Sequence, residues 1–125
     1  MSNHIHMIVK SGDGKLSDTI RDFSSFTTKR LIAAIKEYPE SRREWIFWMF
    51  ERAAKKHKRN MNYQKWTHNN HPEELDSNNF LEQKLDYIHD NPVRSCIVQY
   101  PEEYLYSSAA SYAGMPGLFE VSKLE

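Results

Sequence analysis

Two histidines near the start of the chain have a spacing that can hold a metal ion. The stretch from Asn3 to Val9 alternates polar and apolar residues, as a half-buried β-strand does. Such alternation places His4 and His6 on one face, roughly 6.5 Å apart along the strand, so both imidazoles could reach one divalent cation. Exposed or hydrogen-bonded histidines give the same pattern, so the pair by itself leaves both interpretations open.

A tyrosine and an asparagine one helical turn apart form a second candidate group. Apolar spacing predicts a helix that begins at Asp76 or Ser77 and ends before Pro92. On it, Tyr87 and Asn91 share one side. A tyrosine is a nucleophile once deprotonated, and a carboxamide oxygen can bind a hard cation. A half-buried tyrosine and a C-cap asparagine are the structural alternative.

Helices and a small sheet are expected to position these groups. Hydrophobic periodicity predicts one amphipathic helix over 16–37, ended by Pro39, and another over 40–59, capped by Ser41. The apolar cluster of the second helix is expected in the core, with base stacking as the alternative. That cluster comprises Trp45, Ile46, Trp48, Met49 and Phe50. Residues 62–66 are expected to form a short strand, and 68–76 a loop in which His68 and His71 have no assigned role.

Length and composition limit the class of protein. A chain of 125 residues with 39% hydrophobic and 13% aromatic content fits one folded domain, residues 1–125. It has no apolar run that could span a bilayer and no secretion signal, so we expect no membrane partner and a cytoplasmic location. The single Cys96 fits a reducing compartment, and any metal site has to use histidine, asparagine or carboxylates.

The net charge of zero combines a basic and an acidic part. Residues 29–59 carry ten basic and four acidic side chains, whereas residues 72–125 carry three basic and ten acidic ones. The basic part could follow a phosphate backbone, although solvated helices show similar charges. The cations considered for DNA contact are Arg21, Lys29, Arg30, Lys36, Lys55, Lys56, Lys58, Arg59 and Lys84.

Three stretches together resemble a known family. They are Asn3-His4-Ile5-His6, the run from Tyr87 to Arg94 (YIHDNPVR) with the later tyrosines and serines to 109, and Asn70 to Leu75 (NHPEEL). The chain resembles the REP-associated tyrosine transposases, relatives of the HUH single-strand insertion-sequence transposases with one catalytic tyrosine. The resemblance covers residues 1 to about 114. Ser2 stands where the family's histidine motif usually has proline.

The resemblance implies a fold and a reaction. The fold would be α+β: a small antiparallel sheet that carries the histidines, with helices packed on it. His4, His6 and Asn91 would bind Mg²⁺ or Mn²⁺, and Tyr87 would attack a phosphodiester of single-stranded, hairpin-containing DNA. The products would be a 5′-phosphotyrosine and a free 3′-OH, which allows rejoining without ATP. Since a tyrosine has a pKa of about 10, attack needs the cation or a basic neighbour such as Lys84.

The resemblance also implies incompleteness and an alternative function. In the family, a strand and a helix precede the histidine strand, so we expect an N-terminally truncated domain whose sheet a homodimer could complete. The alternative is a non-catalytic transposase remnant that binds DNA hairpins through residues 29–59. Either protein would act in the cytoplasm, associated with a bacterial nucleoid.

Overall fold

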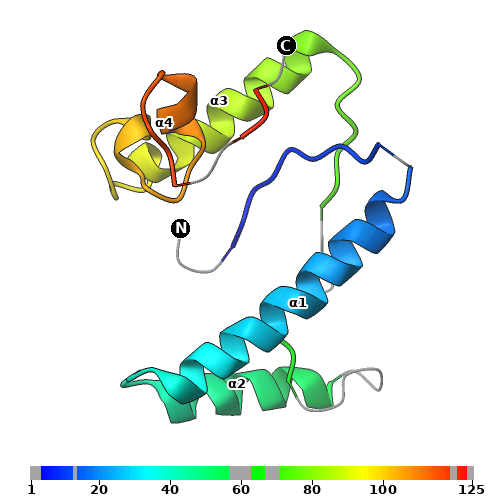
Figure 1. Ribbon diagram of the computed structural model, residues 1–125, viewed down its shortest axis with the longest axis vertical. Helices are drawn as coiled ribbons and strands as arrows, with labels where there is room; N and C mark the ends of the chain where they lie inside the picture. The colour runs from blue at the N-terminus through cyan, green and yellow to red at the C-terminus, as the bar shows by residue number, and fades with distance from the viewer. Residues whose placement is uncertain (1–3, 13, 57–62, 67–70, 119–120, 124–125) are drawn as a thin grey trace. The chain divides into compact units, whose positions relative to one another are not determined.

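The chain folds into helices grouped in two compact units. The computed structural model describes residues 4–12, 14–56, 63–66, 71–118 and 121–123. The elements are α1 (Leu16–Glu37), α2 (Arg43–Lys55), α3 (Asn78–Arg94), the 3₁₀-helix η1 (Pro101–Glu103) and α4 (Ala109–Tyr112) (Figure 1). The central unit comprises Lys10–Pro72 and contains α1 and α2. The terminal unit comprises Met1–Val9 and Glu73–Glu125 and contains α3, η1 and α4.

The prediction of an α+β fold with a small antiparallel sheet is wrong. None of the residues that the structure describes belongs to a β-strand, including 4–9 and 63–66, where strands were predicted. A strand requires a hydrogen-bonded neighbour, and the described chain pairs no second segment with residues 4–9. The alternation therefore does not produce a buried face: Ile5, Met7 and Val9 remain 45–52% exposed.

Helix α1 has the bounds that its apolar spacing predicts. It runs from Leu16 to Glu37 and buries Ile35. Tyr38 leaves the helix with an extended backbone, φ −93° and ψ 153°. This is the conformation that a following proline imposes on its predecessor, so Pro39 ends the helix as expected.

Helix α2 begins later than predicted and without the expected serine cap. It spans Arg43–Lys55, and the residue before it is Arg42, whose side chain makes no capping hydrogen bond. The guanidinium of Arg43 instead donates to the carbonyls of Ile35 and Tyr38, both at 2.8 Å. Because the last carbonyls of α1 lack partners within that helix, Arg43 satisfies them and joins the two helices.

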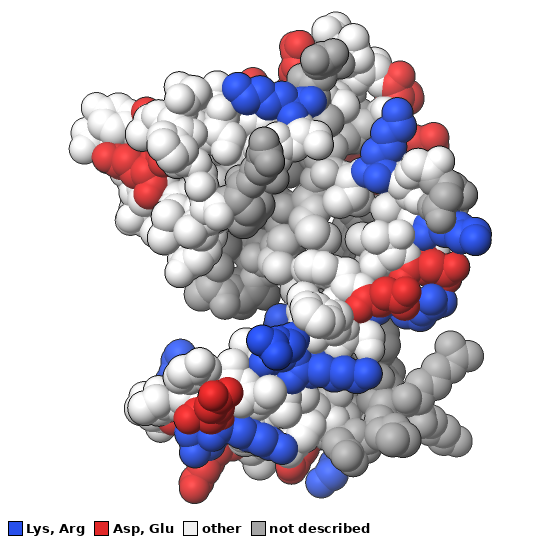
Figure 2. Space-filling view, in the orientation of Figure 1, with Lys and Arg blue, Asp and Glu red and all other residues white. Residues whose placement is uncertain are grey.

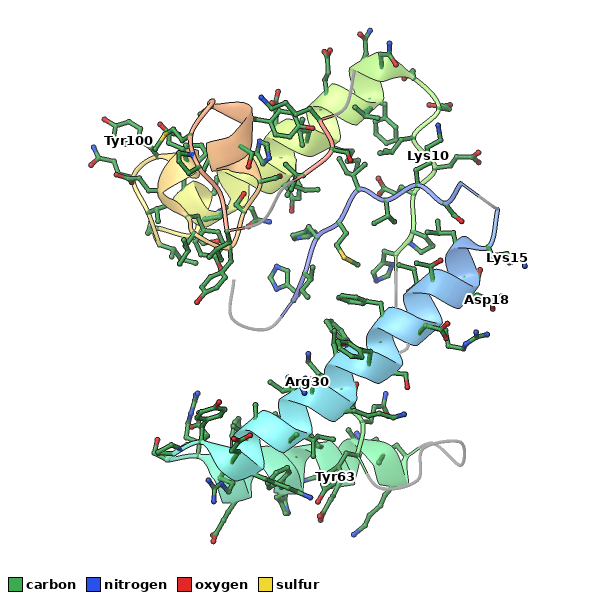
Figure 3. All side chains as sticks on the ribbon, viewed as in Figure 1. Lys10, Lys15, Asp18, Arg30, Tyr63 and Tyr100 are labelled. Atoms are coloured by element: carbon green, nitrogen blue, oxygen red, sulfur yellow. The ribbon has the colours of Figure 1, made fainter. Side chains whose placement is uncertain are left out.

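The segment 63–66 closes the central unit without forming a strand. Trp66 donates from Nε1 to the Thr27 hydroxyl at 3.1 Å and packs against Phe23, their ring centroids 6.1 Å apart. Tyr63, labelled in Figure 3, packs on Phe47 of α2 at 5.3 Å between ring centroids. The segment thus contacts both helices of the unit.

Helix α3 starts as predicted and ends later than predicted. The Ser77 hydroxyl accepts a hydrogen bond from the Phe80 amide at 3.3 Å, so this residue is the N-cap. The helix continues through Pro92 to Arg94, because the missing N–H lies in the last turn and the proline ring is buried. Two residues after Arg94 the chain turns away at Cys96, whose φ of 53° lies in the left-handed region.

Helix η1 packs against both α3 and α4 in the terminal unit. The Glu103 carboxylate accepts from the amides of Gln99 and Tyr100 at 2.9 and 2.8 Å, which fixes the start of η1. The buried side chains here are small, Ala109 and Ala110 of α4 and Pro92 of α3.

Candidate active site

The predicted metal ligands and the predicted nucleophile lie together in the terminal unit. His6 packs edge-on against Tyr87, with 5.8 Å between ring centroids and an interplanar angle of 83°. His4 packs edge-on against His6 in turn, at 4.9 Å. His6 and Tyr87 are 81 residues apart in sequence, so the fold brings the imidazoles to the phenol. Tyr87 remains 46% exposed, open to a large substrate.

Asn91 joins the cluster through His6. The carboxamide Nδ2 of Asn91 lies 3.1 Å from Nε2 of His6, within hydrogen-bonding distance. Tyr87 and Asn91 stand one turn apart on α3, so both face the same segment, as the sequence predicts. In this arrangement the amide donates to the neutral imidazole.

The pKa of His6 is lowered from its ordinary value. The main cause is desolvation of the ring, and the neighbouring His4 adds a smaller electrostatic effect in the same direction. A lowered pKa keeps the imidazole neutral at physiological pH. Its ring nitrogen then has a lone pair available for a hydrogen bond or for a cation.

The donor types of the cluster, imidazole and carboxamide, are ones that divalent cations bind in proteins. Two cis ligands of an octahedral ion at about 2.1 Å lie about 3 Å apart, close to the 3.1 Å between Nε2 of His6 and the Asn91 amide. Turning the Asn91 amide would present its oxygen instead of its nitrogen. Two imidazole nitrogens and one amide oxygen suit Mn²⁺ better than Mg²⁺. No three His, Cys, Asp or Glu side chains come together as a metal site anywhere in the described parts of the chain, the cluster around His6 included.

Arg94 is a member of the cluster that the sequence reasoning missed. Its guanidinium carbon lies 5.7 Å from the centroid of the Tyr87 ring. The signal was available in the sequence, because Arg94 follows Tyr87 by seven residues, two turns on the same helix face. It brings a positive charge to a site where a phosphate would react.

Lys84, predicted as a basic neighbour of Tyr87, is engaged elsewhere. Its ammonium group forms an ion pair with Glu73 and lies 5.1 Å from the Phe80 ring centroid. The structure therefore gives no contact between this lysine and the tyrosine. The ion pair ties the segment before α3 to the first half of the helix.

His89 ties the tyrosine helix to the C-terminal elements. Its Nε2 lies 2.8 Å from the Ser108 hydroxyl, and its ring packs edge-on against Tyr112 at 5.2 Å. Burial lowers the pKa of His89, and Asp86 opposes this shift in part. Sequence reasoning did not single out this histidine, because nothing local indicates that residue 108 returns to α3.

The predicted DNA-contacting cations differ in their surroundings. Arg21 pairs with Asp18 at 2.6 Å and Asp22 at 3.1 Å on the first turns of α1, so its charge is locally offset. Lys36 lies 5.9 Å from the Phe47 ring centroid. Those with exposed side chains on the central unit include Lys29, Arg30, Lys55 and Lys56. In Figure 2, acidic side chains lie among the cations over α1 and α2.

Some predicted residues fall outside what the structure describes. Lys58 and Arg59 are among them, and so is His68. His71 is exposed in the segment that leads to α3. The roles of these residues therefore stay predictions or stay unassigned.

Comparisons with known proteins found no relative of the chain. No family model, no curated protein and no solved structure matches the chain. No helix in the described ranges is long and apolar enough to cross a membrane.

Proposed function

We propose that the chain cleaves and rejoins single-stranded DNA through a covalent bond to Tyr87, assisted by a divalent metal that His4, His6 and Asn91 hold. The observation that carries the proposal is the contact of His6 with both Tyr87 and Asn91. The resemblance of the two motifs to the REP-associated tyrosine transposases supports the same reaction. The described residues form no sheet, which counts against that family's fold but leaves this local geometry unchanged.

Each side chain of the cluster has a distinct part in the proposed reaction. When bound, Mn²⁺ or Mg²⁺ would polarise the scissile phosphate and offset its negative charge. His4 and His6 would supply imidazole nitrogens, and Asn91 would supply its amide oxygen after turning. Arg94 offers its guanidinium to a phosphate oxygen beside the phenol. The exposure of Tyr87 admits the DNA backbone.

The covalent step conserves the energy of the phosphodiester bond. The phenol of Tyr87 gives its proton to solvent and its oxygen forms a bond to phosphorus. The bond from phosphorus to the 3′ oxygen breaks, and that oxygen takes a proton from solvent. The products are a 5′-phosphotyrosine and a free 3′-OH, and attack by a 3′-OH on the phosphotyrosine restores a DNA strand.

One observation favours the second candidate, a DNA-hairpin-binding protein without catalysis. The amide nitrogen of Asn91 faces His6, and an amide nitrogen does not bind a cation. In that case the contact is a structural hydrogen bond between the segment 4–9 and α3. DNA would then bind through cations without reacting.

The experiment that tests the proposal follows the two ends of one DNA strand. Hairpin oligonucleotides with randomised flanks, labelled at either the 5′ or the 3′ end, are incubated with the protein and Mn²⁺ and separated in SDS. Because Tyr87 would keep the 5′ phosphate of the downstream fragment, the 3′ label should migrate with the protein. The 5′ label should be released on a shorter strand.

Matched tyrosine variants assign the reaction to one phenol. Tyr87→Phe should abolish the adduct, whereas Tyr100→Phe, another exposed tyrosine of the same unit (Figure 3), should retain it. Retarded DNA with neither adduct nor cleavage would support the non-catalytic candidate. Release of both fragments without an adduct would indicate hydrolysis by water and would refute the covalent step.

A further inference from the structure

Helix α2 has one packed face and one exposed face. Phe50 and Ala54 are buried, and Phe47 packs on Tyr63. At 100° per residue these three positions share a narrow arc of the helix. That arc is the side on which α2 is packed within the central unit.

The opposite arc combines indoles with positive charge. It carries Trp45, Trp48, Met49, Arg52, Lys55 and Lys56, all exposed, a set we call the tryptophan stripe. The indole residues are 54% and 53% exposed. The acidic residues of α2, Glu44 and Glu51, lie at the border of this arc, about 20° and 40° from Lys55 by the same helical count. The sequence-based expectation that these tryptophans belong to the core is therefore wrong.

A contact within the stripe shows how its groups can act together. The guanidinium carbon of Arg52 lies 5.2 Å from the centroid of the Trp48 ring. An arginine over an indole adds positive charge to a flat aromatic surface, and nucleobases with their phosphates complement both. Trp45 precedes Trp48 and Met49 by three and four residues, so these side chains adjoin on one face of α2, and a contiguous apolar patch is typical of a binding surface.

We infer that the tryptophan stripe of α2 is a binding surface for single-stranded nucleic acid, on which bases stack against Trp45 and Trp48. Residues three apart on a helix have Cβ atoms about 5–6 Å apart, more than the 3.4 Å rise of stacked bases. The indoles therefore suit unstacked bases. Arg52, Lys55 and Lys56 contact the phosphates.

Charge complementarity distinguishes this occupant from two others. An apolar protein partner would bury three cations without neutralising them, at a cost in desolvation. A membrane-bound helix separates its apolar and cationic faces, whereas here the cations alternate with the indoles in one arc. Single-stranded nucleic acid satisfies the rings and the charges together.

The inference deepens the proposed function by adding a second contact to the same class of DNA, and it rests on that function only for the choice of DNA. Binding to the stripe needs neither Tyr87 nor a metal. The unaltered chain should therefore bind oligonucleotide when no divalent metal is present. Oligonucleotide binding to the tryptophan stripe without a covalent adduct would refute the proposed function alone. A covalent adduct without oligonucleotide binding to the stripe would refute this inference alone.

The test uses the full chain and oligothymidylate of 20 nucleotides in the presence of EDTA. Stacking should quench tryptophan fluorescence, and anisotropy of a labelled oligonucleotide should give the affinity. Trp45→Leu and Trp48→Leu should each weaken binding roughly tenfold. Arg52→Gln should reduce the slope of log affinity against log salt by about 0.7.

A matched variant and a vesicle control make the result decisive. Tyr106→Leu removes another exposed aromatic side chain, 73% exposed and in the terminal unit, and should leave the affinity unchanged. Equal affinity of both tryptophan variants and the unaltered chain would overturn the inference. Quenching of the tryptophan fluorescence by anionic lipid vesicles but not by DNA would also overturn it. The same holds if self-association shields the tryptophans from acrylamide before DNA is added.

Discussion

The contact between His6 and Asn91 can be tested without any substrate. His6→Ala removes one hydrogen bond, which contributes about 0.5–1.5 kcal/mol, and the edge-on contact with Tyr87, which contributes a similar amount. Because both residues are close to solvent, we expect values near the lower limits. His6→Ala should therefore lower the free energy of unfolding by about 1–2 kcal/mol. Asn91→Ala should lower it by about 0.5–1 kcal/mol.

A double-mutant cycle isolates the pair. Alanine also raises the helix propensity at position 91, but the cycle cancels this gain because it occurs in both backgrounds. The double variant should be less destabilised than the sum of the single variants by about 0.5–1 kcal/mol. Urea unfolding followed by circular dichroism provides the free energies.

The positions of the tryptophans provide an internal control. Trp45, Trp48 and Trp66 all belong to the central unit, so their fluorescence reports its unfolding alone. If the two units unfold separately, the site variants move the dichroism transition and leave the fluorescence transition in place. Coincident shifts would instead support the predicted single domain. Strict additivity of the two substitutions would refute the contact between the imidazole and the amide.

Three further predictions concern helix ends and histidine protonation. Arg43→Met should lower the free energy of unfolding by about 1–3 kcal/mol, because two hydrogen bonds to carbonyls are lost. Arg42→Met, a change to an exposed side chain, should alter it by less than about 0.5 kcal/mol. Urea unfolding followed by tryptophan fluorescence measures both. Cys96→Gly should stabilise the chain by about 1 kcal/mol because it relieves a positive φ, and Gly114→Ala should destabilise it by a similar amount; thermal unfolding would contradict this if both changes had the same sign. The pKa of His89 is lowered in the folded chain, so its stabilising contribution is present above the ordinary value of 6.5 and is lost as the pH falls through the folded value. His89→Gln should therefore flatten the loss of stability between neutral and acid pH. An unchanged pH profile of this variant would refute the prediction.

Local sequence signals predicted the helices but not their tertiary partners. The bounds of α1 and the Ser77 cap follow from apolar spacing and hydroxyl chemistry, which act within a few residues. The start of α2 was misplaced because Arg43, not a serine, satisfies the adjacent backbone, and its partners are five and eight residues away. Pro92 was expected to end α3, but the buried ring is accommodated in the last turn.

The sheet and the tryptophans show the limit of pattern alone. Alternation in residues 4–9 indicates which side chains share a face, but a strand also needs a neighbour, which periodicity cannot supply. Trp45 and Trp48 were expected in the core because their cluster is too apolar to be exposed to solvent on every side. The helix instead uses Phe50 and Ala54 for packing.

The sequence predicted the residues of the candidate site better than it predicted the secondary structure that positions them. The sequence singled out His4, His6, Tyr87 and Asn91, and the structure places them in one unit, where His6 contacts each of the other three. Their catalytic and metal-binding roles stay predictions. The expected sheet that was to carry the histidines is replaced by an irregular segment held against α3.

Locating the covalent bond tests the central claim most directly. The adduct formed with hairpin DNA and Mn²⁺ is treated with nuclease and trypsin, and the remaining nucleotide is located by mass spectrometry. Cleavage after Lys84 and Arg94 releases residues 85–94, a peptide whose single tyrosine is Tyr87. We predict a nucleotide bound through its 5′ phosphate to that tyrosine. A nucleotide on any other peptide, or no modified peptide from a chain that has cut the DNA, would contradict the account.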